Sequence, residues 1–264
     1  MYLREKIDLT GNVAIVTGAG RGLGKAICLE LASAGVDIVL VARTAKEITE
    51  VGDEVKALGR MALPIQCDVR EKSQVDAVVD QAIKKFGKID ILVNNSGSLI
   101  LKRFLDFTDE DWQFTLDVNL RGTFLFCQAA GKHMVEQKYG KIINISSADA
   151  LHPIPWAQAY CAAKAGLIGF TKSLASEWAK HSINVNAIAP GYFDTNALRT
   201  ALDQDKVKVK IDDIIKKYLP MQRMGDDREI AAAVAFLASP ASNYITGIVL
   251  TVDGGYLIQN PVKG

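Results

Sequence analysis

Short apolar runs alternate with longer helical patterns along nearly the whole chain of 264 residues. Seven runs have the length and composition of strands, and most are continuously apolar, as expected of strands covered on both faces. These runs are Val13–Thr17, Asp37–Ala42, Ala62–Gln66, Ile89–Val93, Gly140–Ser146, Ile183–Ala187 and Ile248–Val252. The helical stretches between them include Gly22–Ala34, Lys46–Leu58, Lys72–Phe86, Asp109–Gln137, Ala157–Lys180 and Asp227–Ala238.

This alternation predicts right-handed βαβ units and a parallel sheet. We expect an α/β fold: a single Rossmann-type doubly wound domain over residues 1–264, with helices on both faces of a seven-stranded parallel sheet. Residues 192–222 break the rhythm, because many charges surround their apolar positions. This segment follows the C-terminal end of a strand, so it is either an exposed amphipathic helix or a substrate lid.

Composition excludes several classes of protein. The net charge is +1 and the basic residues are scattered, which gives no electrostatic case for nucleic acid or an anionic membrane. With no signal-peptide pattern and no long apolar run, we expect a cytoplasmic protein. The histidines show no metal-ligand spacing, so no metal site is expected. The four cysteines are Cys28, Cys67, Cys127 and Cys161. We expect reduced, buried thiols at these positions in preference to two disulfides, because the rest of the chain is typical of an intracellular enzyme.

A glycine-rich loop follows the first strand directly and leads into a helix. It reads Thr17-Gly-Ala-Gly-Arg-Gly-Leu-Gly24. Glycines let backbone amides approach a pyrophosphate, and the N-terminus of the following helix attracts its negative charge. The glycine spacing differs from the GxGxxG of long-chain dehydrogenases, which indicates a different dinucleotide-binding family.

The end of the second strand predicts which dinucleotide binds. A carboxylate there accepts from the ribose 2′-hydroxyl of NAD, whereas a basic residue accommodates the 2′-phosphate of NADP. The strand ends in Ala42 and Arg43, without a carboxylate. Arg43 could pair with the phosphate and Arg21 could assist, or both could be solvated surface arginines. The sequence favours NADP(H) over NAD(H), with Asp68 after the third strand placed to accept from the adenine amino group.

Tyr160 and Lys164 lie four residues apart near the start of a predicted helix, on one face. A tyrosine is a poor base at neutral pH, because its ordinary pKa is about 10. A nearby ammonium and the positive charge of oxidised nicotinamide would favour the phenolate and lower the pKa of Tyr160. Lys164 would thereby make Tyr160 a usable general acid/base. Taken alone, the pattern also fits an ordinary helix pair.

The full set of motifs resembles the short-chain dehydrogenase/reductase family, over nearly the whole chain. Serine replaces alanine in the family's Asn-Asn-Ala-Gly motif, and the family's serine, thirteen residues before the tyrosine, falls on Ser147 and not on Ser146. The residues that carry the resemblance are Thr17, Gly18, Gly22, Gly24, Asn94, Asn95, Ser96, Gly97, Asn119, Ser147, Tyr160, Lys164, Pro190, Gly191 and Thr195.

The resemblance implies a catalytic tetrad of Asn119, Ser147, Tyr160 and Lys164. Ser147 would hydrogen-bond the substrate oxygen, and Tyr160 would give that oxygen its proton in reduction and take it in oxidation. Lys164 would also hold the nicotinamide ribose, and Asn119 would anchor a water in the proton relay. The implied cofactor contacts are Gly18, Arg21, Gly22, Leu23, Gly24, Arg43, Asp68, Asn95, Gly97, Tyr160, Lys164, Gly191 and Thr195.

Two features leave the substrate open. Ala150 closes the serine loop where the family usually has glycine, and residues 152–156 mix apolar bulk with one histidine. The closest resemblance is to 3-oxoacyl-carrier-protein reductases and to sugar, polyol and steroid dehydrogenases. A carrier protein would need a basic patch beside the active-site mouth, for which Lys138, Lys180 and His181 are a thin set. A small-molecule carbonyl or alcohol is therefore favoured.

Two further expectations concern other functional classes and assembly. A non-catalytic nucleotide-sensing protein would not need the complete tetrad, and an epimerase or dehydratase usually shows a different motif arrangement. The resemblance implies a homotetramer. The long helical stretches Asp109–Gln137 and Ala157–Lys180 carry apolar residues beyond one face, which also suggests partner subunits.

Overall fold

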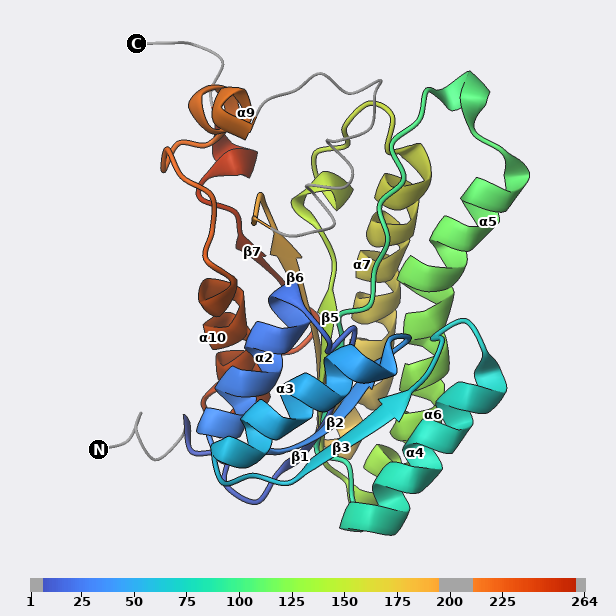
Figure 1. Cartoon of the computed structure of the whole chain (residues 1–264), viewed down its shortest axis with the longest axis vertical. Helices are drawn as coiled ribbons and strands as arrows, with labels where there is room; N and C mark the ends of the chain where they lie inside the picture. The colour runs from blue at the N-terminus through green and yellow to red at the C-terminus, as the bar shows by residue number, and fades with distance from the viewer. Residues whose placement is uncertain (1–6, 195–210, 260–264) are drawn as a thin grey trace.

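The computed structural model describes residues 7–194 and 211–259 (Figure 1). Its centre is a parallel seven-stranded sheet, as the sequence predicts, and the strand order is β3-β2-β1-β4-β5-β6-β7. The strands are β1 (Val13–Thr17), β2 (Asp37–Ala42), β3 (Ala62–Gln66), β4 (Ile91–Asn94), β5 (Gly140–Ile145), β6 (Ile183–Pro190) and β7 (Val249–Val252).

Helices cover both faces of the sheet. One layer contains α2 (Gly22–Ser33), α3 (Ala45–Ala57) and α10 (Asp227–Ala238), and the other contains α4 (Lys72–Phe86), α6 (Gly122–Gln137) and α7 (Gln158–Trp178). Strand β1 contributes side chains to the apolar cores on both faces of the sheet. Ala14 and Val16 pack into one core, and Val13 and Ile15 pack into the other. Burial on both faces explains why its sequence is continuously apolar.

The helix expected over Asp109–Gln137 is interrupted. It consists of α5 (Asp109–Leu116), a π-helical turn (Asp117–Arg121) and α6. The side-chain amide of Asn119 donates to the carbonyl oxygen of Thr115 at 2.9 Å. This carbonyl lies four residues earlier, so the side chain competes for the acceptor that an α-helical turn would use. The competition accounts for the widened turn, which periodicity alone does not predict.

The remaining elements are short. Helix α9 (Ile211–Tyr218) lies in the charged segment, so the helical interpretation of 192–222 is right for this part, while residues 195–210 lie outside the described ranges. The 3₁₀ turns are Phe104–Asp106, Ala148–Ala150, Ala179–His181, Pro240–Ser242 and Tyr256–Ile258.

The strand order creates a gap in the helical cover at one edge of the sheet. The chain crosses from β3 over β2 and β1 to reach β4, so the connections that follow β1 and β4 leave the sheet in opposite directions. Ligands of doubly wound sheets bind at such a switch point, beyond the carboxyl ends of the strands.

Candidate active site

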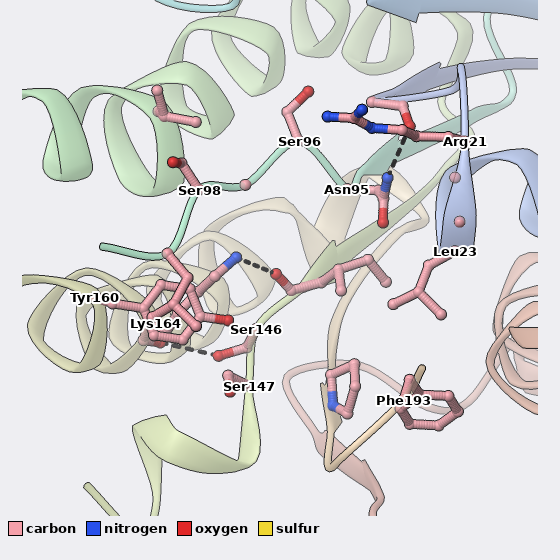
Figure 2. A pocket seen from close by; sticks show the side chains of 18 of the residues that line it. Arg21, Leu23, Asn95, Ser96, Ser98, Ser146, Ser147, Tyr160, Lys164 and Phe193 are labelled. Atoms are coloured by element: carbon pink, nitrogen blue, oxygen red, sulfur yellow. Dashed lines mark hydrogen bonds between the residues drawn. The ribbon is translucent and has the colours of Figure 1, made fainter. Parts of the chain in front are cut away.

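A cavity of about 340 Å³ opens at this switch point. The segments that follow the seven strands line it, together with residues of α2, α3, α5, the π-helical turn and α7. Every cofactor residue expected from the sequence lines this cavity except Thr195, which lies outside the described residues. Figure 2 shows Arg21 and Asn95 at one end and Ser147, Tyr160 and Lys164 at the other.

The glycine loop brings backbone against backbone. Gly18 has a positive φ of 66°, and a Cβ on Gly24 would lie 2.0 Å from the Gly18 carbonyl oxygen, so only glycine fits at position 24. Helix α2 begins here with no side-chain cap and no acidic residue in its first turn. Its first backbone N–H groups therefore have no side-chain acceptor, which suits a pyrophosphate. The residues present fit a dinucleotide.

Asn95 holds this loop in place. Its side-chain amide donates to the carbonyl oxygens of Thr17 at 3.0 Å and Gly18 at 3.3 Å. The Thr17 hydroxyl in turn accepts from the backbone N–H groups of Asn95 and Ser96, both at 3.0 Å. Asn95 therefore positions the walls of the cavity in addition to lining it.

The adenosine end contains a carboxylate that sequence reasoning missed. Glu47, in the first turn of α3, lines the cavity and forms an ion pair with Arg21 at 3.7 Å. Thr44 and Glu47 have the spacing of a capping box, yet Thr44 makes no side-chain cap. Glu47 is therefore free to face the glycine loop. Arg43 is exposed at the cavity rim, where Ala42 leaves room beside it.

Asp68 lies in the cavity wall, but its carboxylate is already engaged. Both oxygens accept from the guanidinium of Arg70, at distances of 2.7 to 3.1 Å. Hydrogen bonding to Arg70 lowers the pKa of Asp68, so the group is ionised at neutral pH. Arg70 also lies over the ring of Phe114, with its guanidinium carbon 5.0 Å from the ring centroid.

The two serines that follow β5 make different hydrogen bonds. The Ser146 hydroxyl donates to the backbone carbonyl of Lys164 at 3.0 Å and is buried. Ser147 instead accepts from the backbone N–H of Asp149 at 3.1 Å, which leaves its own hydrogen available to donate. Tyr160 and Lys164 lie beside it on α7 (Figure 2). The geometry therefore favours Ser147, the serine chosen by spacing.

Lys164 is buried and its ammonium donates to the carbonyl of Ile145 at 2.7 Å. Burial lowers the pKa of Lys164 to about 8, and its ammonium lies 5.7 Å from the ring centroid of Tyr160. In the protein alone, burial raises the pKa of Tyr160, and the charge of Asp149 raises it further. The expected lowering of the Tyr160 pKa by Lys164 is thus wrong for the protein alone, because desolvation and Asp149 dominate.

Asn119 does not line the cavity within the described part of the chain. It is fully buried, and its side-chain amide donates to the carbonyls of Ser98 at 2.8 Å and Thr115 at 2.9 Å. Its side-chain oxygen accepts from the backbone N–H of Ser98. The side chain therefore positions the loop after β4 and has no spare amide hydrogen for the expected water. The oxygen atoms of Asn119 can still accept from a water, so its role in the proton relay stays a prediction.

Asp149 is a second group without a role in the sequence interpretation. It lies in the cavity wall two residues after Ser147, on the turn Ala148–Ala150. Burial raises the pKa of Asp149 to about 6, although hydrogen bonding with Ser147 and the charge of His152 oppose this shift. A carboxylate at this depth indicates a polar substrate end of the cavity.

Three structural observations bear on the other expectations. The four cysteines are buried free thiols. Among residues 7–194 and 211–259, no group of three or more histidine, cysteine, aspartate or glutamate side chains could hold a metal ion. None of the helices in these two ranges has the length and apolar character needed to cross a membrane.

The sequence and the fold both match known proteins. A family model described as enoyl-(acyl carrier protein) reductase matches residues 18–257. The 2-dehydro-3-deoxy-D-gluconate 5-dehydrogenase of Escherichia coli is 42% identical over 96% of this chain and 98% of its own length. A 3-oxoacyl-(acyl-carrier-protein) reductase of Synechocystis is 40% identical over 95% of this chain and 98% of its own.

The structural match is equally extensive. The crystal structure of a short-chain type dehydrogenase/reductase from Mycobacterium marinum has a TM-score of 0.91 and 36% identity, and covers 97% of this chain and 100% of that one. The similar proteins are named dehydrogenases and reductases, which excludes the non-catalytic nucleotide-sensing alternative. The chain therefore belongs to the short-chain dehydrogenase/reductase family and is an oxidoreductase that acts on a carbonyl or alcohol group.

Proposed function

We propose that this enzyme interconverts a carbonyl and a secondary alcohol of a small molecule, with NADP(H) as the preferred cofactor and Tyr160 as the general acid/base. The arrangement of Ser147, Tyr160 and Lys164 around one end of the dinucleotide-sized cavity carries this proposal. When bound, the nicotinamide supplies or accepts the hydride.

The side chains of this end manage the proton and the developing charge. Ser147 donates to the substrate oxygen and stabilises its negative charge as a carbonyl is reduced. Tyr160 donates its hydroxyl proton to that oxygen in reduction and accepts it in oxidation. Because the pKa of Tyr160 is raised, the tyrosine is protonated and ready to reduce a carbonyl at neutral pH. Oxidation needs the phenolate, so its rate should rise with pH.

The adenosine end supports a preference for NADP(H), with one opposing group. Arg43 lies at the cavity rim as a cation, and Ala42 offers no carboxylate for a 2′-hydroxyl. Arg21 could bind the same phosphate, but it is paired with Glu47, whose carboxylate adds negative charge nearby. We infer that Arg43 provides most of the preference and that Glu47 limits it.

The names of the similar proteins point to two substrate classes, a sugar acid and a carrier-protein thioester. The basic residues considered for carrier docking argue against the thioester. Tyr160 is in the first turn of α7, whereas Lys180 and His181 follow its last turn. At 1.5 Å per residue, that helix separates them from Tyr160 by roughly 30 Å. They do not lie beside the active-site mouth, so a small-molecule substrate remains our proposal.

We expect the protein to oxidise NADPH with a subset of carbonyl compounds. A panel of ketones, ketoses, 3-oxoacyl thioesters and steroids should be measured with NADPH, and the matching alcohols with NADP⁺. Ser147→Ala should abolish most turnover of whichever substrate reacts, because the oxyanion donor is lost. Absence of turnover with every class, in protein that binds NADPH, would contradict the proposed function.

We propose a homotetramer with two kinds of interface. Trp112 on α5 and Phe124 on α6 are exposed apolar residues of one face. Tyr244 and Ile248, before the edge strand β7, are exposed on another. Two separate apolar faces are what two-fold symmetric dimers of dimers bury. Sedimentation at micromolar concentration should give a mass near four 28.6 kDa chains, and Phe124→Lys should reduce it. A wild-type monomer would contradict this.

We also propose that residues 192–222 form a substrate lid on a single domain. The backbone N–H of Gly225 donates to the Tyr192 carbonyl at 3.0 Å, which ties the two ends of the segment together. Beside α9, Leu219 packs in a small apolar cluster with Tyr256, which lines the cavity.

We also propose a cytoplasmic location, because the buried free thiols fit a reducing compartment.

A further inference from the structure

Asp149 is a carboxylate that the proposed chemistry does not need. In the described part of the chain it forms no ion pair with a lysine or arginine. Its charge raises the pKa of Tyr160, which opposes formation of the phenolate. Burying the Asp149 carboxylate is costly, and its charge disfavours the Tyr160 phenolate that oxidation needs. A contact between this carboxylate and the substrate would offset these two costs.

The surroundings of Asp149 are polar and aromatic. Tyr192 and Tyr256 meet edge to face with ring centroids 5.3 Å apart, and His152 packs edge to face on Tyr256 at 5.6 Å. The titratable groups whose charges act on Asp149, or on which it acts, are His152, Tyr160, Cys161, Tyr192 and Tyr256. A carboxylate among phenol groups matches a ligand with several hydroxyl groups better than an acyl chain.

Asp149 also competes for the hydrogen of the Ser147 hydroxyl. Ser147 accepts from the Asp149 backbone N–H at 3.1 Å, so its hydroxyl hydrogen is its remaining contribution. Hydrogen bonding with Ser147 lowers the pKa of Asp149 and also opposes the rise in the pKa of Tyr160, so these two groups compete for the Ser147 hydroxyl. A hydrogen directed at the Asp149 carboxylate is not directed at the substrate oxygen. Catalysis therefore improves when another donor satisfies that carboxylate.

We propose that Asp149 accepts a hydrogen bond from a substrate hydroxyl on the carbon next to the reacting carbon, and that this contact frees Ser147 to donate to the reacting oxygen. The enzyme then selects α-hydroxy ketones and vicinal diols, the chemistry of ketoses and polyols, over unsubstituted ketones and 3-oxoacyl thioesters. This inference rests on the proposed function, because it needs turnover at the same site. It makes Asp149 a specificity-determining residue.

The charge of Asp149 narrows the substrate further. Among the described lining residues, Asp149 and Lys164 are the charged groups at this end of the cavity, since Arg21, Arg43, Glu47 and Asp68 belong to the adenosine end. The Lys164 ammonium is buried and donates to the backbone carbonyl of Ile145. A substrate carboxylate attached directly to the reacting carbon would meet the like charge of Asp149, whereas a neutral hydroxyl would not. The position beside the reacting carbon is therefore for a neutral hydroxyl.

The test compares 1-hydroxybutan-2-one with butan-2-one in reduction, and butane-1,2-diol with butan-2-ol in oxidation. A charge-assisted hydrogen bond predicts roughly ten- to a hundredfold higher kcat/KM for the hydroxylated member of each pair. Asp149→Leu should bring the ratio to within about threefold, mainly by accelerating the unsubstituted ketone relative to its partner. Glu177→Gln, which removes an exposed carboxylate from α7, is the matched control and should keep the wild-type ratio.

The pH dependence separates this role from a merely structural one. Because the pKa of Asp149 is about 6, the wild-type ratio should be full above that pH and should fall below it as the carboxylate takes up a proton. His152 is the neighbour whose charge acts on Asp149. His152→Gln should therefore keep the decline, and Asp149→Leu should lose it.

Two results with the wild-type enzyme would overturn the inference without any variant. One is a kcat/KM ratio near one between the hydroxylated and unsubstituted member of each pair. The other is a higher kcat/KM for a 3-oxoacyl thioester than for a ketose. If no compound is turned over, the proposed function fails first. Calorimetry with the NADPH-bound protein then compares butane-1,2-diol with butan-2-ol directly, and equal affinities would overturn the role of Asp149.

Discussion

Replacing Tyr160 with phenylalanine is expected to lower kcat by about 10²–10⁴-fold in both directions. The substitution removes only the hydroxyl that exchanges the proton with the substrate oxygen, and the ring keeps its packing on α7. Cofactor affinity should change little, because the backbone of the glycine loop and the ammonium of Lys164 are unaffected. Steady-state kinetics gives kcat, and quenching of protein fluorescence by NADPH gives the dissociation constant.

The control for this variant is Tyr139→Phe, since Tyr139 directly precedes β5, at the opposite end of that strand from Ser147, and does not line the cavity. It should have wild-type kcat. The rise of the oxidation rate with pH should also disappear in Tyr160→Phe, because the titrating phenol is gone. Full activity in Tyr160→Phe, or an unchanged pH profile, would end the proposed role of Tyr160.

Local sequence patterns predicted the elements well, and they placed Ser147, Tyr160 and Lys164 in one cavity, as the structure shows. The strands β1, β2 and β3 and the helices α4 and α10 have the predicted bounds. Continuous apolar runs and helical periodicity are properties of neighbouring residues, so they survive in any packing. The spacing between Ser147 and Tyr160 favoured Ser147 over Ser146, and the hydrogen bonds of the two serines support the same choice, which stays a prediction.

Features that depend on contacts between distant segments were not predicted. The π-helical turn at Asn119 requires the loop after β4, whose Ser98 backbone binds the Asn119 side chain. The charge of Asp149 acts on Tyr192 and Tyr256, the latter more than a hundred residues along the chain. The pKa of Tyr160 moved against expectation because local charge spacing does not report desolvation.

The distance of Lys180 and His181 from the active-site mouth is a different case. The predicted helix Ala157–Lys180 already placed Tyr160 in its first turn and the two basic residues beyond its last. Multiplying its length by the helical rise would have separated them. The sequence alone could therefore have shown that Lys180 and His181 lie too far from Tyr160 to form a docking patch at the active-site mouth.

The second large effect concerns the cofactor, and we expect Ala42→Asp combined with Arg43→Ala to reverse the preference from NADPH to NADH. Removing Arg43 deletes a planar, permanently charged partner of the 2′-phosphate. A charge-assisted hydrogen bond contributes on the order of 1.5–3 kcal/mol, which at ~1.4 kcal/mol per tenfold corresponds to roughly ten- to a hundredfold. The new carboxylate accepts from a 2′-hydroxyl and repels a 2′-phosphate. Titrating both cofactors into wild type and double variant measures the change.

Glu47 provides an independent arm of the same experiment. Glu47→Gln breaks the ion pair with Arg21 and removes negative charge from the adenosine end. The pair joins two partly exposed side chains at 3.7 Å, so the expected gain in NADPH affinity is modest, up to about fivefold. NADH affinity should stay nearly constant, because its 2′-hydroxyl carries no charge. A gain that fades at high salt would mark it as electrostatic.

Two results would contradict this view of the adenosine end. One is a wild-type protein that binds NADH as tightly as NADPH, and the other is a double variant that keeps its NADPH preference. Arg43 stacked on the adenine ring would help both cofactors equally. Arg43→Ala alone distinguishes this case, because it would then weaken NADH and NADPH by the same factor. A role in phosphate binding instead requires that Arg43→Ala weaken NADPH selectively, and that Glu47→Gln strengthen it selectively through the released Arg21.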